Sequence, residues 1–314
     1  MANKKTATRD RYGEVLKKLA EHDSNIIAMD CDLGRSTRAY RITEVDKTRF
    51  IESGISEQDM ISTAAGLAHE GKIVFANSFA VFIVGRAFDQ IRQQVCLANQ
   101  NVKICGSSAG ITQGSDGATH QSVIDVSLMR SLPNMMVMVP ADGPQTEAAV
   151  IAAYNHKGPV YIRLSRHEIE DVYPQDYRFD IFKAVEMYKG KDIAFVTCGP
   201  VLSNVVEAVR LLREKGIEVG LIDVPVIKPL DKESIMTAAL KYSKLITVEE
   251  QNVYGGLGSA VAEVVAVMES HKKASLCIVG IEDTFGESGS AEELLKKHKL
   301  DPDSLVEKVL HMVS

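Results

Sequence analysis

Short runs of β-branched and other apolar residues alternate along this chain with longer segments whose apolar positions recur every three or four residues. The short runs are typical of buried strands, and the periodic segments are typical of amphipathic helices. Their alternation from end to end predicts parallel sheets with crossover helices. We therefore expect an α/β protein made of two doubly wound domains.

The individual elements follow from the same pattern. In the first half, strands are expected at 26–29, 74–77, 102–106, 135–139 and 160–164, with helices at 9–21, 59–70, 84–98, 122–130 and 144–155. In the second half, strands are expected at 193–198, 219–224, 245–249 and 276–280. A helix at 203–215 has Ser203 as its predicted N-cap, and the pairs Ser290/Glu293 and Ser304/Glu307 predict capping boxes for the last two helices.

A segment of weak periodicity separates the two halves. Residues 171–189 are rich in Tyr, Asp and Pro, which predicts an irregular linker between a first domain at 1–170 and a second at 190–314. The chain has 314 residues, of which 45% are hydrophobic and 25% charged. This is enough apolar material for two ordinary cores.

Charge and composition exclude several classes of protein. The net charge of −6, without a long basic stripe, argues against a nucleic-acid partner. The N-terminus has no apolar block like that of a signal peptide, and no run approaches the roughly 18 apolar residues of a membrane span. We expect a soluble cytoplasmic protein that acts on small molecules, with neither nucleic acid nor membrane as a partner.

Cysteine and histidine spacing gives no metal site. The five cysteines contain no Cys-x-x-Cys pair, and the eight histidines show no His-x-x-x-His spacing. Cys31 follows a predicted strand between two aspartates, which should disfavour its thiolate. We expect reduced thiols, no cysteine nucleophile and no protein-only metal centre.

In doubly wound sheets, ligands bind beyond the carboxyl ends of the strands. Polar or glycine-containing loops follow predicted strands at 30–36, 77–79, 106–110, 140–143 and 164–167. The residues at 109–121, here called the glycine loop, are long for a connection and end on Asp116 and His120. Loops of this length inside compact domains are usually functional or disordered, and the charged residues favour function.

The segment Gly54-Ile55-Ser56-Glu57 places one glutamate in the first turn of an expected helix. Ser56 and Asp59 have the spacing of a capping-box variant. On this evidence alone, Glu57 is a carboxylate at the positive end of a helix dipole, where it stabilises the helix by up to about 1 kcal/mol. The rest of the chain changes that interpretation.

Three segments, in this order and at these separations, resemble the pyrimidine-binding domain of transketolase: Gly-Ile-Ser-Glu at 54–57, Phe-Ala-Val-Phe at 79–82 and Asp-Gly-Ala-Thr-His-Gln at 116–121. Thr-Cys-Gly at 197–199 and the segment 248–258 resemble the C-terminal domain of the same family. The resemblance covers nearly the whole chain. The chain lacks the family's Gly-Asp-Gly motif, which holds Mg²⁺ and diphosphate, so the resemblance implies the C-terminal subunit of a split transketolase.

The resemblance implies thiamine diphosphate as the cofactor. Glu57 matches the catalytic glutamate that bonds the aminopyrimidine ring. Phe79 and Phe82 match the aromatic wall around that ring, although core packing is the alternative for both. Gly85 stands where the family has a third aromatic residue, and Asp32 matches an acidic residue near the thiazolium side of the site.

The remaining matches concern the substrate. Asp116 and His120 match residues that bind the hydroxyls and carbonyl oxygen of the ketose, which makes His120 a catalytic candidate. Arg9, Ser36 and Arg166 match the anchors of the sugar phosphate, a task that suits the planar fork of a guanidinium. For Arg9 the alternative is a solvated cation near the N-terminus.

Ser108 departs from the pattern, because transketolases carry a substrate-contacting histidine there and deoxyxylulose phosphate synthases an arginine. Substrate preference therefore stays open.

The implied function is transfer of a two-carbon ketol unit between sugar phosphates, as in the pentose phosphate pathway. It requires an N-terminal-half partner that brings Mg²⁺ and the diphosphate site, with a heterotetramer of two copies of each chain as the expected assembly. The alternatives are a β subunit of a 2-oxo acid dehydrogenase, which residues 88–92 resemble, a deoxyxylulose phosphate synthase-like enzyme, and an inert scaffold or regulatory subunit.

Overall fold

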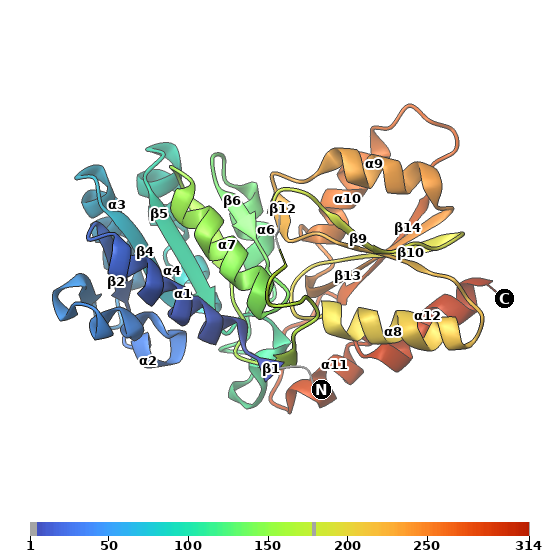
Figure 1. Cartoon of the computed structure of the whole chain (residues 1–314), viewed down its shortest axis with the longest axis horizontal. Coiled ribbons are helices and arrows are strands. Elements are labelled where there is room, and N and C mark those ends of the chain that lie inside the picture. Colours follow the sequence, from blue (N-terminus) through green and yellow to red (C-terminus); the bar gives the residue numbers. More distant parts are fainter. Residues whose placement is uncertain (1–4, 178–179, 314) are drawn as a thin grey trace.

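The computed structural model describes residues 5–177 and 180–313. Residues 1–4 of the expected first domain, 178–179 of the expected linker and 314 of the expected second domain lie outside the described residues. Two α/β units lie side by side along the long axis of the molecule (Figure 1). Each contains a largely parallel sheet with helices on both faces, as the alternating sequence pattern predicts.

The first sheet is formed mainly by the N-terminal half of the chain. Its strands are β2 (Ile26–Asp30), β3 (Phe50–Glu52), β4 (Ile73–Phe79), β5 (Val102–Ser107), β6 (Met136–Met138), β7 (Val160–Arg163) and β12 (Val226–Lys228). They lie in the order β12-β6-β7-β5-β4-β2-β3. Pairing is parallel throughout except at β12, which runs antiparallel to β6. The strands are almost wholly apolar because helices cover both faces.

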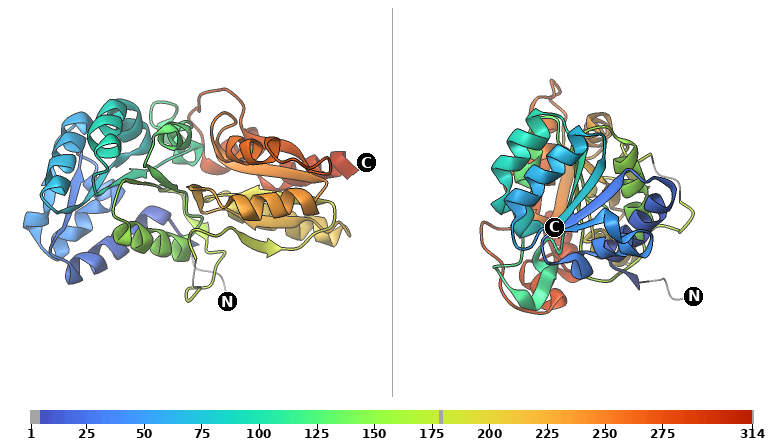
Figure 2. Two further views of the ribbon diagram at one scale, coloured as in Figure 1. Left: turned by 90° about the horizontal axis from the view of Figure 1, so that it is seen from above. Right: turned by 90° about the vertical axis from the view of Figure 1, so that its left-hand side faces the viewer.

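Two groups of helices cover this sheet, one on each face (Figure 2). One face carries α1 (Thr8–His22) and α7 (Gly143–Asn155); the other carries α3 (Glu57–His69), α4 (Ala80–Arg86), α5 (Phe88–Gln90), the π-helix Ile91–Leu97 and α6 (Asp125–Ser131). Short turns complete the unit: α2 (Gly34–Thr37) and the 3-10 segments Ala39–Glu44, Lys47–Arg49 and Ile111–Asp116. The single helix expected at 84–98 is wrong, because the chain breaks at Ala87, whose φ of −104° and ψ of 20° are not helical.

The second sheet has the order β14-β13-β10-β11-β9. Its strands are β9 (Val185–Tyr188), β10 (Ile193–Thr197), β11 (Gly220–Asp223), β13 (Lys244–Asn252) and β14 (Ser275–Ile281). Helices α9 (Lys232–Lys241) and α10 (Leu257–Ala266) lie on one side, and α8 (Leu202–Glu214) and α12 (Pro302–Val313) on the other, with α11 (Ala291–Lys297) nearby (Figure 1). The segment 171–189, expected to be irregular, supplies β9 as an antiparallel edge strand.

The predicted helix caps are only partly right. Ser290 and Glu293 form the expected capping box at α11. Ser203 is the second residue of α8 rather than its N-cap. At α12, the carboxylate of Asp301 accepts from the backbone N–H of Ser304 at 3.2 Å, so an aspartate three residues earlier takes the place predicted for the serine. A carboxylate fits this position because it also complements the helix dipole.

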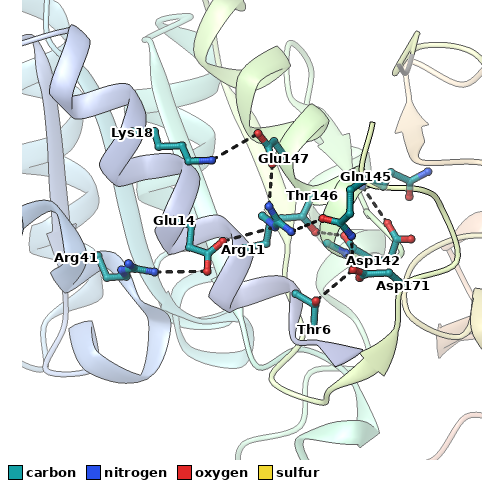
Figure 3. A network of polar contacts seen from close by, with 12 residues as sticks. Thr6, Arg11, Glu14, Lys18, Arg41, Asp142, Gln145, Thr146, Glu147 and Asp171 are labelled. Atoms are coloured by element: carbon teal, nitrogen blue, oxygen red, sulfur yellow. Dashed lines mark hydrogen bonds and ion pairs between the residues drawn. The ribbon is translucent and has the colours of Figure 1, made fainter. Parts of the chain in front are cut away.

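The loop 140–143, a candidate ligand loop from the sequence, is hydrogen-bonded to the start of α7 and to residues 172–173. Asp142 caps α7 by accepting from the N–H of Gln145 at 2.9 Å, and it accepts from Val172 and Tyr173 N–H at 2.8 Å each. The Gln145 amide donates to Asp223 of β11 at 2.6 Å. Asp142 and Gln145 belong to a larger polar network that also includes Arg11 and Glu147 (Figure 3).

The same network fixes α1, the helix whose first turn carries Arg9. Arg11 donates to Glu147 of α7 at 3.0 Å, and Lys18 lies 3.9 Å from the other oxygen of that carboxylate (Figure 3). Thr6, in the short strand β1 (Lys5–Thr6) that pairs with β8 (Ile169–Glu170), donates to Asp171 at 3.3 Å. The N-terminal segment is therefore anchored at several points. In the described ranges, no helix is long and apolar enough to cross a membrane.

Candidate functional site

Glu57 is the first residue of α3, as the sequence predicts, but it is not a surface helix cap. Its side chain is 1% exposed, and both of its oxygens accept from Arg86 of α4, at 2.9 and 2.7 Å. Ser56 is the N-cap residue, yet its hydroxyl donates to the carbonyl of Ser53 at 2.6 Å instead of capping the helix. A buried carboxylate needs a charged or hydrogen-bonding partner, and Arg86 provides it.

An aromatic cluster stands next to this ion pair. Phe79 is the last residue of β4 and Phe82 lies in the first turn of α4, with their rings stacked at 5.9 Å and an interplanar angle of 14°. The His120 ring contacts both edge-on, at 6.2 and 5.3 Å between centroids. The Arg86 guanidinium lies 4.9 Å above the Phe82 ring and connects the cluster to Glu57. The fold thus brings four of the predicted site residues together.

The aromatic wall is open on one side. A Cβ added at Gly85 would meet nothing within 4 Å in the described part of the chain. Gly85 occupies the position at which the resemblance predicts a third aromatic residue, so space remains beside Phe82. A flat ring could therefore approach the wall without displacing a side chain at this position.

A second, cationic group contains Arg9 and Arg166, and Arg166 contacts the glycine loop at Asp116. Arg9 donates to the carbonyl of Ser36 at 3.1 Å, and Arg166 donates to the carboxylate of Asp116 at 2.9 Å. Burial lowers the pKa of Arg9, and the nearby charges of Arg38 and Arg166 lower it further, against the opposing effect of Asp10. Arg9 is half-buried in this group rather than freely solvated, and clustered guanidinium groups favour an anionic ligand.

Asp32 lies in a loop shaped by its buried neighbour Asp30. Asp32 is exposed, has a φ of 61°, and donates its N–H to Glu52 at 2.7 Å. Asp30 accepts from the N–H of Leu33 at 2.7 Å and from the hydroxyl of Thr37 at 2.6 Å. Burial raises the pKa of Asp30 to about 7. The structure places Asp32 beside Glu52.

The thiol of Cys31, next to Asp32, is buried. Burial, together with the smaller effect of the nearby carboxylates of Glu57 and Asp30, raises the pKa of Cys31 to about 12. The Cys31 sulfur lies 3.5 Å from the sulfur of Met60 in the core. This agrees with the expectation that the thiolate is disfavoured.

Ser108, at the position where the sequence departs from the family pattern, is strained and buried. Its φ is 54°, which is uncommon outside glycine, and its hydroxyl has no hydrogen-bond partner within the described residues. Strained backbone and unpaired buried polar atoms tend to gather at functional sites. A small hydroxyl therefore takes the place at which the resemblance leads us to expect a histidine or arginine.

Two residues important to the site escaped the sequence analysis. Arg86 contacts both Phe82 and Glu57, and its spacing of four from Phe82 in a helix was the available signal. Glu250, on β13, accepts from the N–H of Thr112 in the glycine loop at 2.6 Å. Glu250 and Thr112 are far apart in the sequence, so no local pattern indicates their contact.

The donor set fits one end of thiamine diphosphate. A buried carboxylate beside stacked aromatic rings, with open space at Gly85, suits an aminopyrimidine ring. The diphosphate end needs a hard cation with several oxygen ligands. Across residues 5–177 and 180–313, no group of three or more His, Cys, Asp or Glu side chains is arranged to hold a metal ion.

Comparison with protein families identifies both units. The model of the transketolase pyrimidine-binding domain matches residues 4–171, and that of the transketolase C-terminal domain matches residues 183–305. A putative transketolase C-terminal section from Methanocaldococcus jannaschii is 40% identical over 306 residues, covering 96% of this chain and 95% of the relative. One of the subunits of the apulose-4-phosphate transketolase of Phocaeicola vulgatus is 35% identical, covering 100% of this chain and 99% of the relative.

Full-length enzymes and a solved structure agree with this relationship. Transketolase from Rattus norvegicus is 36% identical over 99% of this chain, which covers 49% of that enzyme. The structure of a split-gene transketolase, an inactive beta4 tetramer, superimposes with a TM-score of 0.87 at 39% identity and covers 97% of both chains. The chain therefore belongs to the transketolase family and carries the pyrimidine-binding and C-terminal domains, the part found on a separate subunit in the split enzymes.

Proposed function

We propose that this chain is the C-terminal-half subunit of a thiamine diphosphate-dependent transketolase, and that it transfers a two-carbon ketol unit between sugar phosphates together with an N-terminal-half partner. The observation that carries the proposal is the buried Glu57 carboxylate beside the stacked rings of Phe79 and Phe82. The family is thiamine diphosphate-dependent. A chain with the pyrimidine site but no metal cluster in its described part is suited to completing a site shared with another subunit.

Each residue near the wall has a defined task in this proposal. The bound cofactor supplies the electron sink for the two-carbon unit. Glu57 holds a proton between its carboxylate and a ring nitrogen of the pyrimidine, which is acid–base catalysis by a positioned side chain. Phe79 and Phe82 orient the ring and exclude water, and Arg86 holds the Glu57 carboxylate in place. His120 directs its imidazole towards the carbonyl oxygen of the ketose.

The cationic group sets the class of substrate. Arg9 and Arg166 would bind the anionic end of the sugar, with Ser36 beside them and Asp116 bonding a hydroxyl. Relatives are named for apulose 4-phosphate and for 6-deoxy-6-sulfo-D-fructose, so a phosphate or a sulfonate is compatible with this type of subunit. We propose a ketose with a tetrahedral anionic group, and pentose phosphate pathway sugars are the first to test.

The partner requirement rests on the divided cofactor site. We propose a chain that carries the diphosphate and Mg²⁺ site, assembled with this one as two copies of each, because a site built between chains favours a symmetric assembly. A split-gene relative that contains only the equivalent subunit is an inactive tetramer, which supports this arrangement.

Reconstitution tests the proposal. The chain alone, the partner alone and the mixture are assayed with thiamine diphosphate and Mg²⁺ for ketol transfer from a ketose phosphate, a sulfonated ketose and the free ketose. Transfer should require both chains, and it should be much faster with either anionic donor than with the free ketose. Activity of this chain alone would refute the shared site, and decarboxylation of a 2-oxo acid in place of transfer would favour the dehydrogenase alternative.

The inert-scaffold alternative needs a separate variant. Glu57→Ala in the reconstituted complex should abolish most ketol transfer if Glu57 acts on the cofactor. Transfer near the wild-type rate would leave this residue with a structural role only.

A further inference from the structure

The glycine loop at 109–121 is held in place by the C-terminal domain. Glu250, near the end of β13, is 3% exposed. Its Oε1 atom accepts from the backbone N–H of Thr112 at 2.6 Å and from the Thr112 hydroxyl at 2.7 Å. Hydrogen bonds to a buried charged acceptor are among the stronger ones in proteins. A residue of the second domain thus holds the first part of the loop in place at Thr112.

The backbone of the loop is shaped to receive this carboxylate. Gly110 has a φ of +82°, and a Cβ added there would overlap the Glu250 carboxylate. Only glycine combines this backbone conformation with so close an approach. The contact with Glu250 therefore requires a glycine at position 110 of the glycine loop.

A second contact holds the other end of the loop. The side-chain amide of Gln121 donates to the carbonyls of Ile111 at 3.2 Å, Gly114 at 3.0 Å and Glu287 at 2.8 Å. The first two carbonyls belong to the loop and the third to the C-terminal domain. Asp116 and His120 lie between Thr112 and Gln121, so both proposed substrate residues are carried by a segment fixed at its two ends.

The neighbouring residue shows what a purely structural carboxylate does on this strand. Glu249 is 1% exposed and accepts from the N–H groups of Leu257 and Gly258 at 2.7 and 2.8 Å, at the start of α10 in its own domain. Successive side chains of a strand point to opposite faces. Glu249 therefore caps a helix of its own domain, whereas Glu250 reaches across to the glycine loop.

Burial alone would disfavour the Glu250 charge. Burial raises the pKa of Glu250, and the guanidinium of Arg163 and the Thr112 donors oppose that rise. Arg163 also donates to the backbone carbonyl of Glu250 at 2.8 Å and forms an ion pair with Asp125 at 2.9 Å. A buried carboxylate supported in this way is consistent with a specific positioning role.

We propose that Glu250 is a positioning residue for the loop that carries Asp116 and His120, so that the C-terminal domain sets the geometry of the substrate pocket. The effect of this positioning on catalysis rests on the proposed function. The contact itself can be tested without any activity.

Hydrogen exchange on the full chain tests the contact. Glu250→Ala should speed amide exchange across 111–121 by at least about tenfold, the factor expected for losing a hydrogen bond to a charged acceptor. Glu250→Gln retains an acceptor oxygen and should recover most of the protection. The matched control, Glu249→Ala, should destabilise the start of α10 and leave the loop unchanged. The proposal is overturned if the loop amides of Glu250→Ala exchange at the wild-type rate. It is also overturned if Glu249→Ala speeds their exchange as much as Glu250→Ala does.

Kinetics of the reconstituted complex test the functional meaning. Glu250→Ala should raise KM for the ketose by about tenfold or more, with a smaller change in kcat and an unchanged Kd for thiamine diphosphate. Thr112→Val removes only the hydroxyl donor and should give a smaller KM increase, so it decides the matter if Glu250→Ala does not fold. An unchanged KM and unchanged loop exchange in Thr112→Val, or in Glu250→Ala where that variant folds, refute the role, whereas Glu250→Gln should stay close to wild type in both measurements. If the wild-type complex transfers no ketol unit, the proposed function is wrong. The hydrogen-exchange data would still show whether Glu250 holds the glycine loop.

Discussion

The guanidinium of Arg86 donates to both carboxylate oxygens of Glu57, at 2.9 and 2.7 Å. Glu57 is 1% exposed and Arg86 is 47% exposed, so the pair connects a buried carboxylate to the open side of the site. Two helices are involved, since Glu57 begins α3 and Arg86 ends α4. The position of the carboxylate therefore depends on how these helices pack.

Removing the arginine should be costly because it leaves a buried carboxylate without its partner. Arg86→Met is expected to lower the free energy of unfolding by about 1–3 kcal/mol, less than for a fully buried pair because Arg86 is half exposed. Urea unfolding measures the change. Arg92→Met is the matched control, since Arg92 is 48% exposed and pairs with the exposed Asp89. Its effect should stay below about 0.5 kcal/mol, and equal losses in both variants would contradict the prediction.

Two variants distinguish the proposed role of Glu57 in cofactor chemistry from the effect of a carboxylate at the start of a helix. Glu57→Gln in the reconstituted complex should lower kcat by about 10²–10⁴, the range for loss of a positioned acid or base. Asp59→Asn changes an exposed carboxylate in the same first turn. It should cost at most about 1 kcal/mol of stability through the helix dipole and leave kcat unchanged. A similar kcat loss in both variants would return Glu57 to a dipole role.

Arg166 should act through the anionic group of the substrate. Arg166→Gln is expected to raise KM for a ketose phosphate by about tenfold or more, because a charge-assisted hydrogen bond is lost, and to leave the weak turnover of the free ketose unchanged. Steady-state assays with both donors make the comparison. Arg210→Gln, an exposed arginine on α8 that pairs with Glu207, serves as the control. If both donors are affected equally, Arg166 does not bind the anion.

Asp30 should make stability fall as pH rises. Its pKa in the folded state is about 7, above the ordinary aspartate value of 3.8, so the folded protein retains a proton that the unfolded chain has lost between these values. The contribution to stability is full below about pH 4 and is lost by pH 7, a change of up to roughly 4 kcal/mol. Asp30→Asn should flatten this decline in urea unfolding between pH 5 and 7.5.

A second contribution to this pH dependence comes from the other unit. Burial raises the pKa of Glu249 to about 7. Glu249→Gln should remove a similar part of the decline, and the two effects should add because the residues have no shared partner. A decline that persists in the double variant would show that other groups cause it.

The fold class could be predicted because alternating apolar runs and helical periods extend along the whole chain. The central strands β2, β4, β5 and β7 lie within a few residues of their expected places. The short edge strands β9 and β12 were missed, since a run of three or four residues carries little pattern. The break at Ala87 was missed because the apolar period continues into the π-helix that follows.

The candidate site could be predicted as far as local motifs reach. Glu57, Phe79 and His120 lie in separate motifs, and the parallel sheet brings their loops to one edge. The rule that ligands bind beyond the carboxyl ends of parallel strands therefore points to this edge. Glu250 could not be found this way. Its contact with Thr112 depends on how the second unit docks onto the first, and no period or spacing within the sequence encodes that arrangement.

Strand β12 joins β6 although it lies beyond β10 and β11 in the chain. A gene fragment ending near residue 190 would therefore contain all the helices that surround Glu57 but leave the backbone groups of β6 uncovered. Such an edge is a template for pairing with other chains. The two units should accordingly be inherited and expressed as one piece, and truncation between them should give aggregation rather than a free pyrimidine-binding domain.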